Sequence, residues 1–446
     1  MRLLRTCSRF GLLCTLVIGT ACVSQGEMLG PPYEAVVLDR VEGPAGSSAD
    51  ASEGSDAGFA LRRRELTTIE DFDQLSAAAF RIRQGGTLTA EIVNGDTVTS
   101  GSFDGGDAPD LRYVVEDGAA VPRDYATLLM FSAAYQFEQV SQGLRAATND
   151  RVRAALDEHG ALDVMFGPAM VARVEGVKAS LRMRTNAFFF PDGWQFGLAL
   201  SSPIERAPLA ADRRVIAHEL GHAVFQLAFY HGATSACDGK DASEHAGDAW
   251  FSGRLEAELA FGGLNEGFAD WISFAVTGGT DPIESIAVPP DDELDENVAV
   301  RVLTDDTFRW SNIADQDDDA QTDRRCAGKY CIGTLFARSL VATYLKTGHE
   351  VADEEARHDF SGELVEALEG AQAALRDIEL PLPGDDVAHC KNRDELSSGE
   401  DAPLVGAFLE AFLQGLPGDT RRGLCSELVE RFEAGFPVEF RKECEP

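Results

Sequence analysis

The chain has 446 residues, of which 44% are hydrophobic, and its formal net charge at pH 7 is -36. That length fits two or three packed units, and the hydrophobic content is ample for a core, so disorder throughout the chain is excluded. Strong acidity repels nucleic acid and anionic membrane surfaces, so we exclude nucleic acid as a partner. A solvated, salt-adapted or calcium-binding surface is the simplest explanation of the acidity.

The N-terminus has the features of a bacterial export signal. Three arginines within the first nine residues precede an apolar run at 10–19, which is too short to span a bilayer. Gly19-Thr20-Ala21-Cys22 then resembles a lipobox, although Gly19 stands where Leu is usual. Residues 1–22 are therefore predicted to be a signal peptide followed by lipidation of Cys22. We expect an exported protein of the cell envelope, anchored to the outer membrane or cell surface by that lipid alone, and otherwise secreted.

Cysteine usage agrees with export. Two of the nine cysteines leave with the signal, and Cys22 carries the lipid, so six remain. An even number in an exported chain favours up to three disulfides over a thiolate zinc site, and Cys326 and Cys331 have the wrong spacing for a CxxC pair. The six are Cys237, Cys326, Cys331, Cys390, Cys425 and Cys444.

The first part of the chain contains a predicted linker and then an α+β region. Residues 23–60 are rich in Gly, Pro, Ala, Ser, Asp and Glu, which predicts a flexible linker. Within residues 61–180, the strand pattern at 87–93 is followed by Asn94-Gly95, a favoured hairpin turn. Apolar residues at helical spacing predict a core helix over 124–147. Residues 61–180 are either part of a catalytic lobe or an inhibitory propeptide.

The second part of the chain changes from strands to helices. Asn186-Ala187-Phe188-Phe189-Phe190, a Pro-Asp-Gly turn and the apolar run 194–200 predict a second hairpin. Asp212 is a suitable cap for a helix over 212–227. The remaining pattern predicts an α+β fold with strands early and helices late. Further helices are predicted at 264–276, 332–347, 361–378, 403–415 and 421–434, with a long loop at 231–253 and an acidic, irregular stretch at 281–325.

His218-Glu219-Leu220-Gly221-His222 forms an HExxH pattern in the first of these helices. Residues four apart share a helix face, so both imidazoles point the same way and suit a zinc ion. Glu219 lies one position round from His218 and can reach a water on the metal rather than the metal itself. The spacing therefore predicts zinc ligands at His218 and His222 and a general base at Glu219.

Asn265-Glu266-Gly267-Phe268-Ala269-Asp270 supplies the parts that HExxH lacks. Catalytic zinc takes three protein ligands, and Glu266 can be the third. Asp270 lies on the same helical face and can accept the free ring N–H of a ligand histidine. An exposed acidic helix is the alternative, but it fits poorly with the aromatic residues around these acids, because buried carboxylates need partners.

Together the two motifs resemble those of the gluzincin metallopeptidases, and within them the thermolysin-like group. The resemblance implies a two-lobed zincin whose cleft binds zinc through His218, His222 and Glu266. It also implies Glu219 as general base and Asp270 as the residue that orients a histidine. In that family the Asn and Ala of the edge strand contact the substrate backbone, which implies this role for Asn186 and Ala187.

The chain departs from the family at three places. His222 and Glu266 are further apart than usual, and the loop 231–253 accounts for the insertion. The downstream oxyanion histidine is missing; Tyr330 takes its position, and its hydroxyl either steadies the oxyanion or merely packs there. The family's calcium sites cannot be mapped: Asp315, Asp317 and Asp319 suit Ca²⁺ by ligand type, but an acidic loop explains them as well.

We therefore predict a zinc peptidase acting on peptide or protein substrates. Residues 181–345 are the predicted zincin core, and residues 346–446 a helical C-terminal region. The alternative is a surface-tethered zinc-binding or adhesion protein with a catalytically weak zincin fold. Its main support is the missing downstream histidine.

Overall fold

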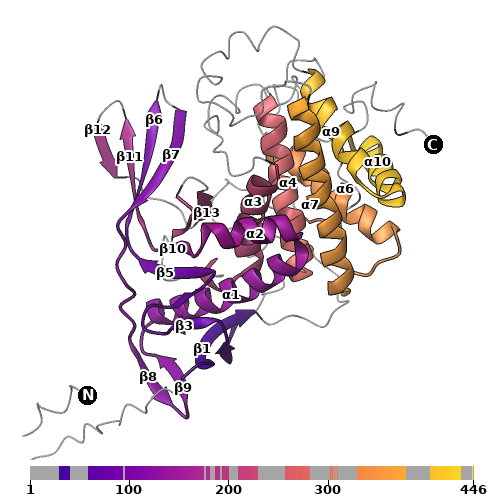
Figure 1. The fold of residues 1–446 in the computed structure, drawn as a ribbon. Helices are drawn as coiled ribbons and strands as arrows, with labels where there is room; N and C mark the ends of the chain where they lie inside the picture. Colours follow the sequence, from indigo (N-terminus) through magenta and orange to yellow (C-terminus); the bar gives the residue numbers. More distant parts are fainter. Residues whose placement is uncertain are drawn as a thin grey trace, which may run out of the picture.

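The described strands all end by residue 199, and most of the described helices follow them (Figure 1), which confirms the predicted α+β class. The signal peptide with Cys22, the loop 231–253 and the calcium candidates at 315–319 lie outside the described residues. None of the described helices has the length and apolar character needed to cross a membrane. The computed structural model describes residues 30–40, 59–93, 96–174, 177–180, 186–190, 193–199, 209–229, 257–281, 302–304, 306, 309, 329–377, 402–432 and 444.

A four-stranded sheet forms the base of the molecule, with the strand order β2-β1-β9-β8. Strand β1 pairs along its whole length with β2, antiparallel, and in parallel with β9. Its Ala35 and Val37 are fully buried. The prediction of a flexible linker over 23–60 is therefore wrong at this strand, because alternate apolar residues give β1 a face that enters the core. The strands are β1 (Tyr33–Arg40), β2 (Phe59–Leu66), β8 (Tyr113–Glu116) and β9 (Ala119–Pro122).

A six-stranded sheet lies above this base, with the order β13-β14-β10-β5-β4-β3. The predicted second hairpin is confirmed: β13 and β14 pair antiparallel, and β13 is at the end of the strand order. β14 continues in parallel with β10, and β10 with β5. The strands are β3 (Ile69–Asp71), β4 (Ser76–Ala77), β5 (Phe80–Gln84), β10 (Leu162–Phe166), β13 (Asn186–Phe190) and β14 (Gln195–Ala199).

A third sheet, ordered β12-β11-β6-β7, projects from the body (Figure 1). It continues two strands of the six-stranded sheet, because β5 leads into β6 and β10 into β11. Gly85, Gly86 and Gly167 stand at these junctions with positive φ, a conformation that suits glycine. The predicted hairpin over 87–99 is confirmed, with a longer second strand. The strands are β6 (Thr87–Val93), β7 (Asp96–Asp104), β11 (Ala169–Val174) and β12 (Val177–Ser180).

Helix α1 (Tyr125–Ala147) is the predicted core helix. Asp124 caps it, since its carboxylate accepts a hydrogen bond of 2.8 Å from the backbone N–H of Thr127. α1 packs against β1, against α3 (Arg213–Ala228) and against α4 (Ala257–Thr277). Two short elements complete this part: α2 (Asp150–His159) and the 3-10 turn Leu209–Ala211.

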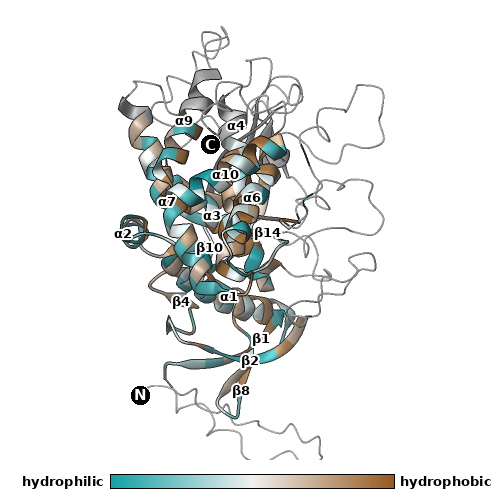
Figure 2. Ribbon diagram, turned by 90° about the vertical axis from the view of Figure 1, so that its right-hand side faces the viewer, coloured by the Kyte–Doolittle hydropathy of each residue, from teal (hydrophilic) through white to brown (hydrophobic). Residues whose placement is uncertain are grey.

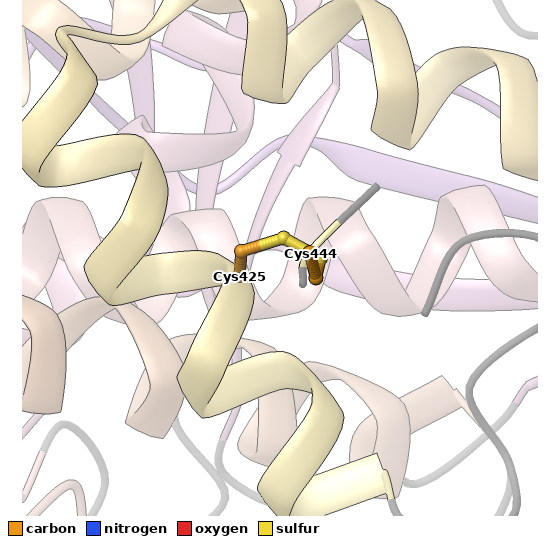
Figure 3. The surroundings of a disulfide bond; sticks show 2 residues. All are labelled: Cys425 and Cys444. Atoms are coloured by element: carbon orange, nitrogen blue, oxygen red, sulfur yellow. A yellow bond between two sulfur atoms is a disulfide. The ribbon is translucent and has the colours of Figure 1, made fainter. Parts of the chain in front are cut away.

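Four more helices lie close to their predicted positions: α6 (Lys329–Lys346), α7 (Glu354–Asp377), α9 (Ala402–Gly415) and α10 (Gly418–Phe432). The first three pack against α4, and α10 packs on α6 and α9. Apolar and polar residues alternate along them (Figure 2), and one core cluster runs from Ala35 of β1 to Phe432 of α10. Cys425 of α10 is bonded to Cys444 (Figure 3), one of the predicted disulfides. The side chains of the other four cysteines lie outside the described part.

Candidate metal centre

Helices α3 and α4 lie against each other and carry both motifs. Asp212 caps α3 as predicted, because its carboxylate accepts a 3.0 Å hydrogen bond from the backbone N–H of Arg214. α4 begins at Ala257 rather than at the predicted Leu264. The helix continues through Gly262 and Gly263, where α6 comes close: a Cβ on Gly333 would lie 3.0 Å from the carbonyl oxygen of Gly263.

Glycines let α4 approach both of its neighbouring helices. A Cβ on Gly221, inside the HExxH pattern, would lie 2.6 Å from the Cα of Ala269. On the other side, a Cβ on Gly267 would overlap the carbonyl oxygen of Gly333 in α6. Real Cβ atoms do not come this close, so each glycine is needed for the spacing of these backbones. The middle positions of both motifs thus set the distance between the helices that carry the charged residues.

His218, His222 and Glu266 meet between α3 and α4. One ligand atom from each lies within 4.8 Å of the others, a spacing at which the three could hold a metal ion. Oε2 of Glu266 is 3.5 Å from Nε2 of His218 and 3.9 Å from Nε2 of His222. The two rings stand nearly perpendicular, with centroids 4.9 Å apart. His218 and Glu266 are each 5% exposed.

Each histidine has an oxygen acceptor at its second ring nitrogen. Nδ1 of His218 lies 2.8 Å from Oδ1 of Asp270, which is fully buried, so the structure brings Asp270 to the predicted ring. Nδ1 of His222 lies 3.0 Å from Oδ1 of Asn265, a residue for which we had predicted no role. The signal was present, because a ligand imidazole needs a partner at its other nitrogen and only one partner had been assigned.

This arrangement fits a divalent metal ion. With the ring hydrogens on Nδ1, beside these oxygens, the Nε2 lone pairs of both rings lie on the side of Glu266. A buried carboxylate such as Glu266 needs a cation or donors near it. Two imidazole nitrogens and one carboxylate oxygen are the donor set of one class of catalytic zinc sites. Among the described residues, no other group of three His, Cys, Asp or Glu side chains comes together in this way.

The other predicted site residues are placed less completely. Glu219 lies on α3 between the two histidines and is partly exposed. Asn186 and Ala187 begin the edge strand β13, against which α3 packs, and Ala187 is 4% exposed. Tyr330 lies in the first turn of α6, and its side chain is outside the described part. A substrate role for Asn186 and Ala187 and an oxyanion role for Tyr330 stay predictions.

No protein-family model matches the chain, and a search of curated proteins finds no match. The case for a function therefore rests on the residues themselves. Two histidines outside the centre stack on aromatic rings, His159 on Trp194 and His349 on Tyr344.

Proposed function

We propose that this chain is a zinc-dependent peptidase of the gluzincin type, with a two-lobed zincin architecture. The observation that carries the proposal is the meeting of His218, His222 and Glu266 between two helices, with a separate acceptor for each imidazole. An accidental His/Glu cluster would not require both rings to be oriented. The sheets and α3 form the first lobe, and α4 with the later helices forms the second.

Zinc bound by these ligands would supply a Lewis acid that lowers the pKa of a water and polarises the scissile carbonyl. Glu219 is next to His218 and is not in the ligand group, and its carboxylate would take the proton of the attacking water and pass it to the leaving amine. Asp270 and Asn265 hold the two rings in place throughout. Tyr330 would steady the oxyanion through its hydroxyl.

Peptide or protein substrates fit the strand next to the site. β13 is at the end of its sheet, and on its outer side no described strand pairs with it. An extended peptide can add to such an edge through main-chain hydrogen bonds, with Asn186 and Ala187 at its start.

We also propose that the protein is exported and lipid-anchored at Cys22. The basic N-terminus, the short apolar run and the lipobox-like tetrapeptide support this placement. The bond between Cys425 and Cys444 also supports it, since disulfides persist in oxidising compartments.

Metal analysis and a mixed peptide library test the peptidase proposal. The purified protein should hold one zinc per chain and cleave library peptides. Glu219→Gln should keep the zinc and lose the cleavage, because it removes only the proton acceptor. Glu366→Gln, an exposed position on α7, is the matched control and should behave as wild type. A wild-type protein that holds zinc but cleaves no better than Glu219→Gln would instead be a zinc-binding or adhesion protein.

A further inference from the structure

An arginine from the base sheet reaches the start of the helix that carries HExxH. Arg40 is the last residue of β1, and its Nη1 lies 3.4 Å from Oδ2 of Asp212, the cap of α3. The two residues are 172 positions apart in the sequence. The Asp212 side chain is 1% exposed and that of Arg40 19% exposed. This ion pair is therefore shielded from water and screened less than a surface pair.

Asp212 also binds α3 through its other oxygen. Oδ1 accepts from the backbone N–H of Arg214 at 3.0 Å and lies 3.5 Å from Nε of the Arg214 side chain. A buried carboxylate is stable only with such partners, and here two guanidinium groups approach it. Because a cap sets where its helix begins, the position of Asp212 determines the position of the first turn of α3.

The connection continues from α3 into α4. Oγ of Ser273 donates a hydrogen bond of 2.9 Å to the carbonyl oxygen of Arg214, and both residues are buried. Arg214 precedes His218 by one turn, and Ser273 follows Asp270 by nearly one turn. The Arg214–Ser273 contact therefore joins the same two helices as the His218–Asp270 contact, about one turn further along.

We propose that Arg40 is a positioning residue for the metal centre. It holds the cap of α3, and so keeps His218 and His222 facing Glu266 on α4. It touches neither metal nor substrate, and its catalytic consequence rests on the proposed function.

A second consequence concerns processing of the chain. The active, mature protein retains β1, so residues 61–180, which follow β1 in the chain, are not a removable propeptide.

Three variants test the proposal, with zinc affinity and the visible spectrum of the cobalt-substituted protein as readouts. Arg40→Gln should weaken zinc binding by roughly tenfold, as loss of an outer partner of a metal site does, and should change the cobalt spectrum. Arg40→Lys keeps the charge and should restore most of the affinity. Arg64→Gln is the matched control: it breaks the ion pair with Asp39 in the same sheet and should leave both readouts unchanged.

The readouts separate positioning from general stability. If Arg40 has a purely structural role, Arg40→Gln should have a lower melting temperature but the same zinc affinity and cobalt spectrum as Arg64→Gln. That result would overturn the proposal. If Arg40→Gln does not fold, Ser273→Ala tests the same connection by deleting one hydroxyl. Zinc affinity equal to wild type in that variant would also overturn it.

The results also separate this proposal from the proposed function. A wild-type protein that binds zinc without cleaving any peptide removes the peptidase proposal alone, because positioning is measured on the metal. A wild-type protein that binds no zinc removes both. N-terminal sequencing of the exported chain adds an independent result: an active mature form that starts after Arg40 contradicts the role of that residue.

Discussion

The two faces of α4 show how one helix can serve a charged site and an apolar core. Toward α3 it presents Asn265, Glu266 and Asp270, each close to a histidine ring. Toward α6 it presents Gly267, which faces Gly333. Both contacts depend on glycine for a close approach, but only the first carries ionisable groups. The residues that could hold a metal ion thus lie on one face of α4, and a close backbone contact with α6 lies on the other.

Glu266 belongs to both faces. Its carboxylate faces the histidines, while its Cβ is so near α6 that a Cβ on Gly333 would lie 2.8 Å from it. The ligand is therefore held at its stem by α6 and at its tip by α3. Close packing limits rotamer changes, which keeps such a ligand pre-organised.

Replacing Glu266 with alanine should have the largest effect on the stabilisation of the fold by zinc. Zinc that binds only the folded state, at a hundredfold excess over its Kd, should raise the free energy of unfolding by about 2.7 kcal/mol. In Glu266→Ala this zinc-dependent increase should vanish, because one of three donors is gone. Chemical unfolding with and without a chelator measures it, and Glu366→Ala on α7 is the control. Equal stabilisation of Glu266→Ala by zinc would show that the metal binds elsewhere.

Adding a methyl group at Gly333, on the side of α4 that faces α6, should have the next largest effect on stability. Gly333→Ala places a Cβ against Glu266 and the Gly263 carbonyl, so we expect a loss of about 1–3 kcal/mol in unfolding free energy. Zinc affinity should fall as well, since the ligand stem must move. Gly362→Ala on α7, where nothing lies within 4 Å, should instead stabilise by about 0.4–1 kcal/mol. If Gly333→Ala loses stability but binds zinc normally, the two faces are independent.

Changing an orienting residue should matter less than changing a ligand. Asp270→Asn keeps the size of the side chain and an acceptor oxygen but loses the charge beside Nδ1 of His218. We expect zinc affinity to fall by roughly 10–100-fold with the fold retained. Competition with a chelator of known affinity measures this value. Affinity as weak as that of Glu266→Ala would mean that Asp270 is itself a ligand.

The sequence was most informative where the signals are local. The cap at Asp212, the HExxH face and the partners of the β13–β14 hairpin are each set by residues within a few positions of one another, so spacing alone predicted them. The meeting of His218, His222 and Glu266 could also be predicted, because zinc chemistry demands a third donor and Glu266 was marked by its apolar neighbours.

Features that depend on distant partners were missed. β1 lies inside a Gly- and Ser-rich stretch, and its strand is stabilised by β2 and β9 rather than by its own composition. The close approach of α4 to α6 at Gly267 and Gly333 joins residues far apart in the sequence. The ion pair of Arg40 joins residues with no sequence pattern in common. Such contacts arise from tertiary packing, which periodicity does not record.

We expect the smallest effect from His358 on α7. This helix packs against α4, but His358 is not part of the contacts of Gly221 or Gly267. Burial lowers the pKa of His358 below its ordinary value, because the charged ring is poorly solvated there; Glu354 raises this pKa and Arg357 lowers it to smaller extents. The folded state therefore favours the neutral ring. The neutral His358 ring stabilises the fold at pH values above its pKa in the unfolded chain, about 6.5. This contribution is lost as the pH falls through its lower pKa in the folded protein.

Replacing His358 with glutamine should remove that part of the acid sensitivity. Unfolding free energies measured with chelator between neutral and mildly acidic pH should fall less steeply for His358→Gln than for wild type. The metal ligands titrate in both proteins, so the difference between the two slopes isolates His358. An unchanged slope would mean that this ring is as well solvated in the folded protein as in the unfolded chain. A reduced slope with unchanged zinc affinity at neutral pH would show that His358 affects the stability of the fold but not the contacts of α4 with α3 and α6.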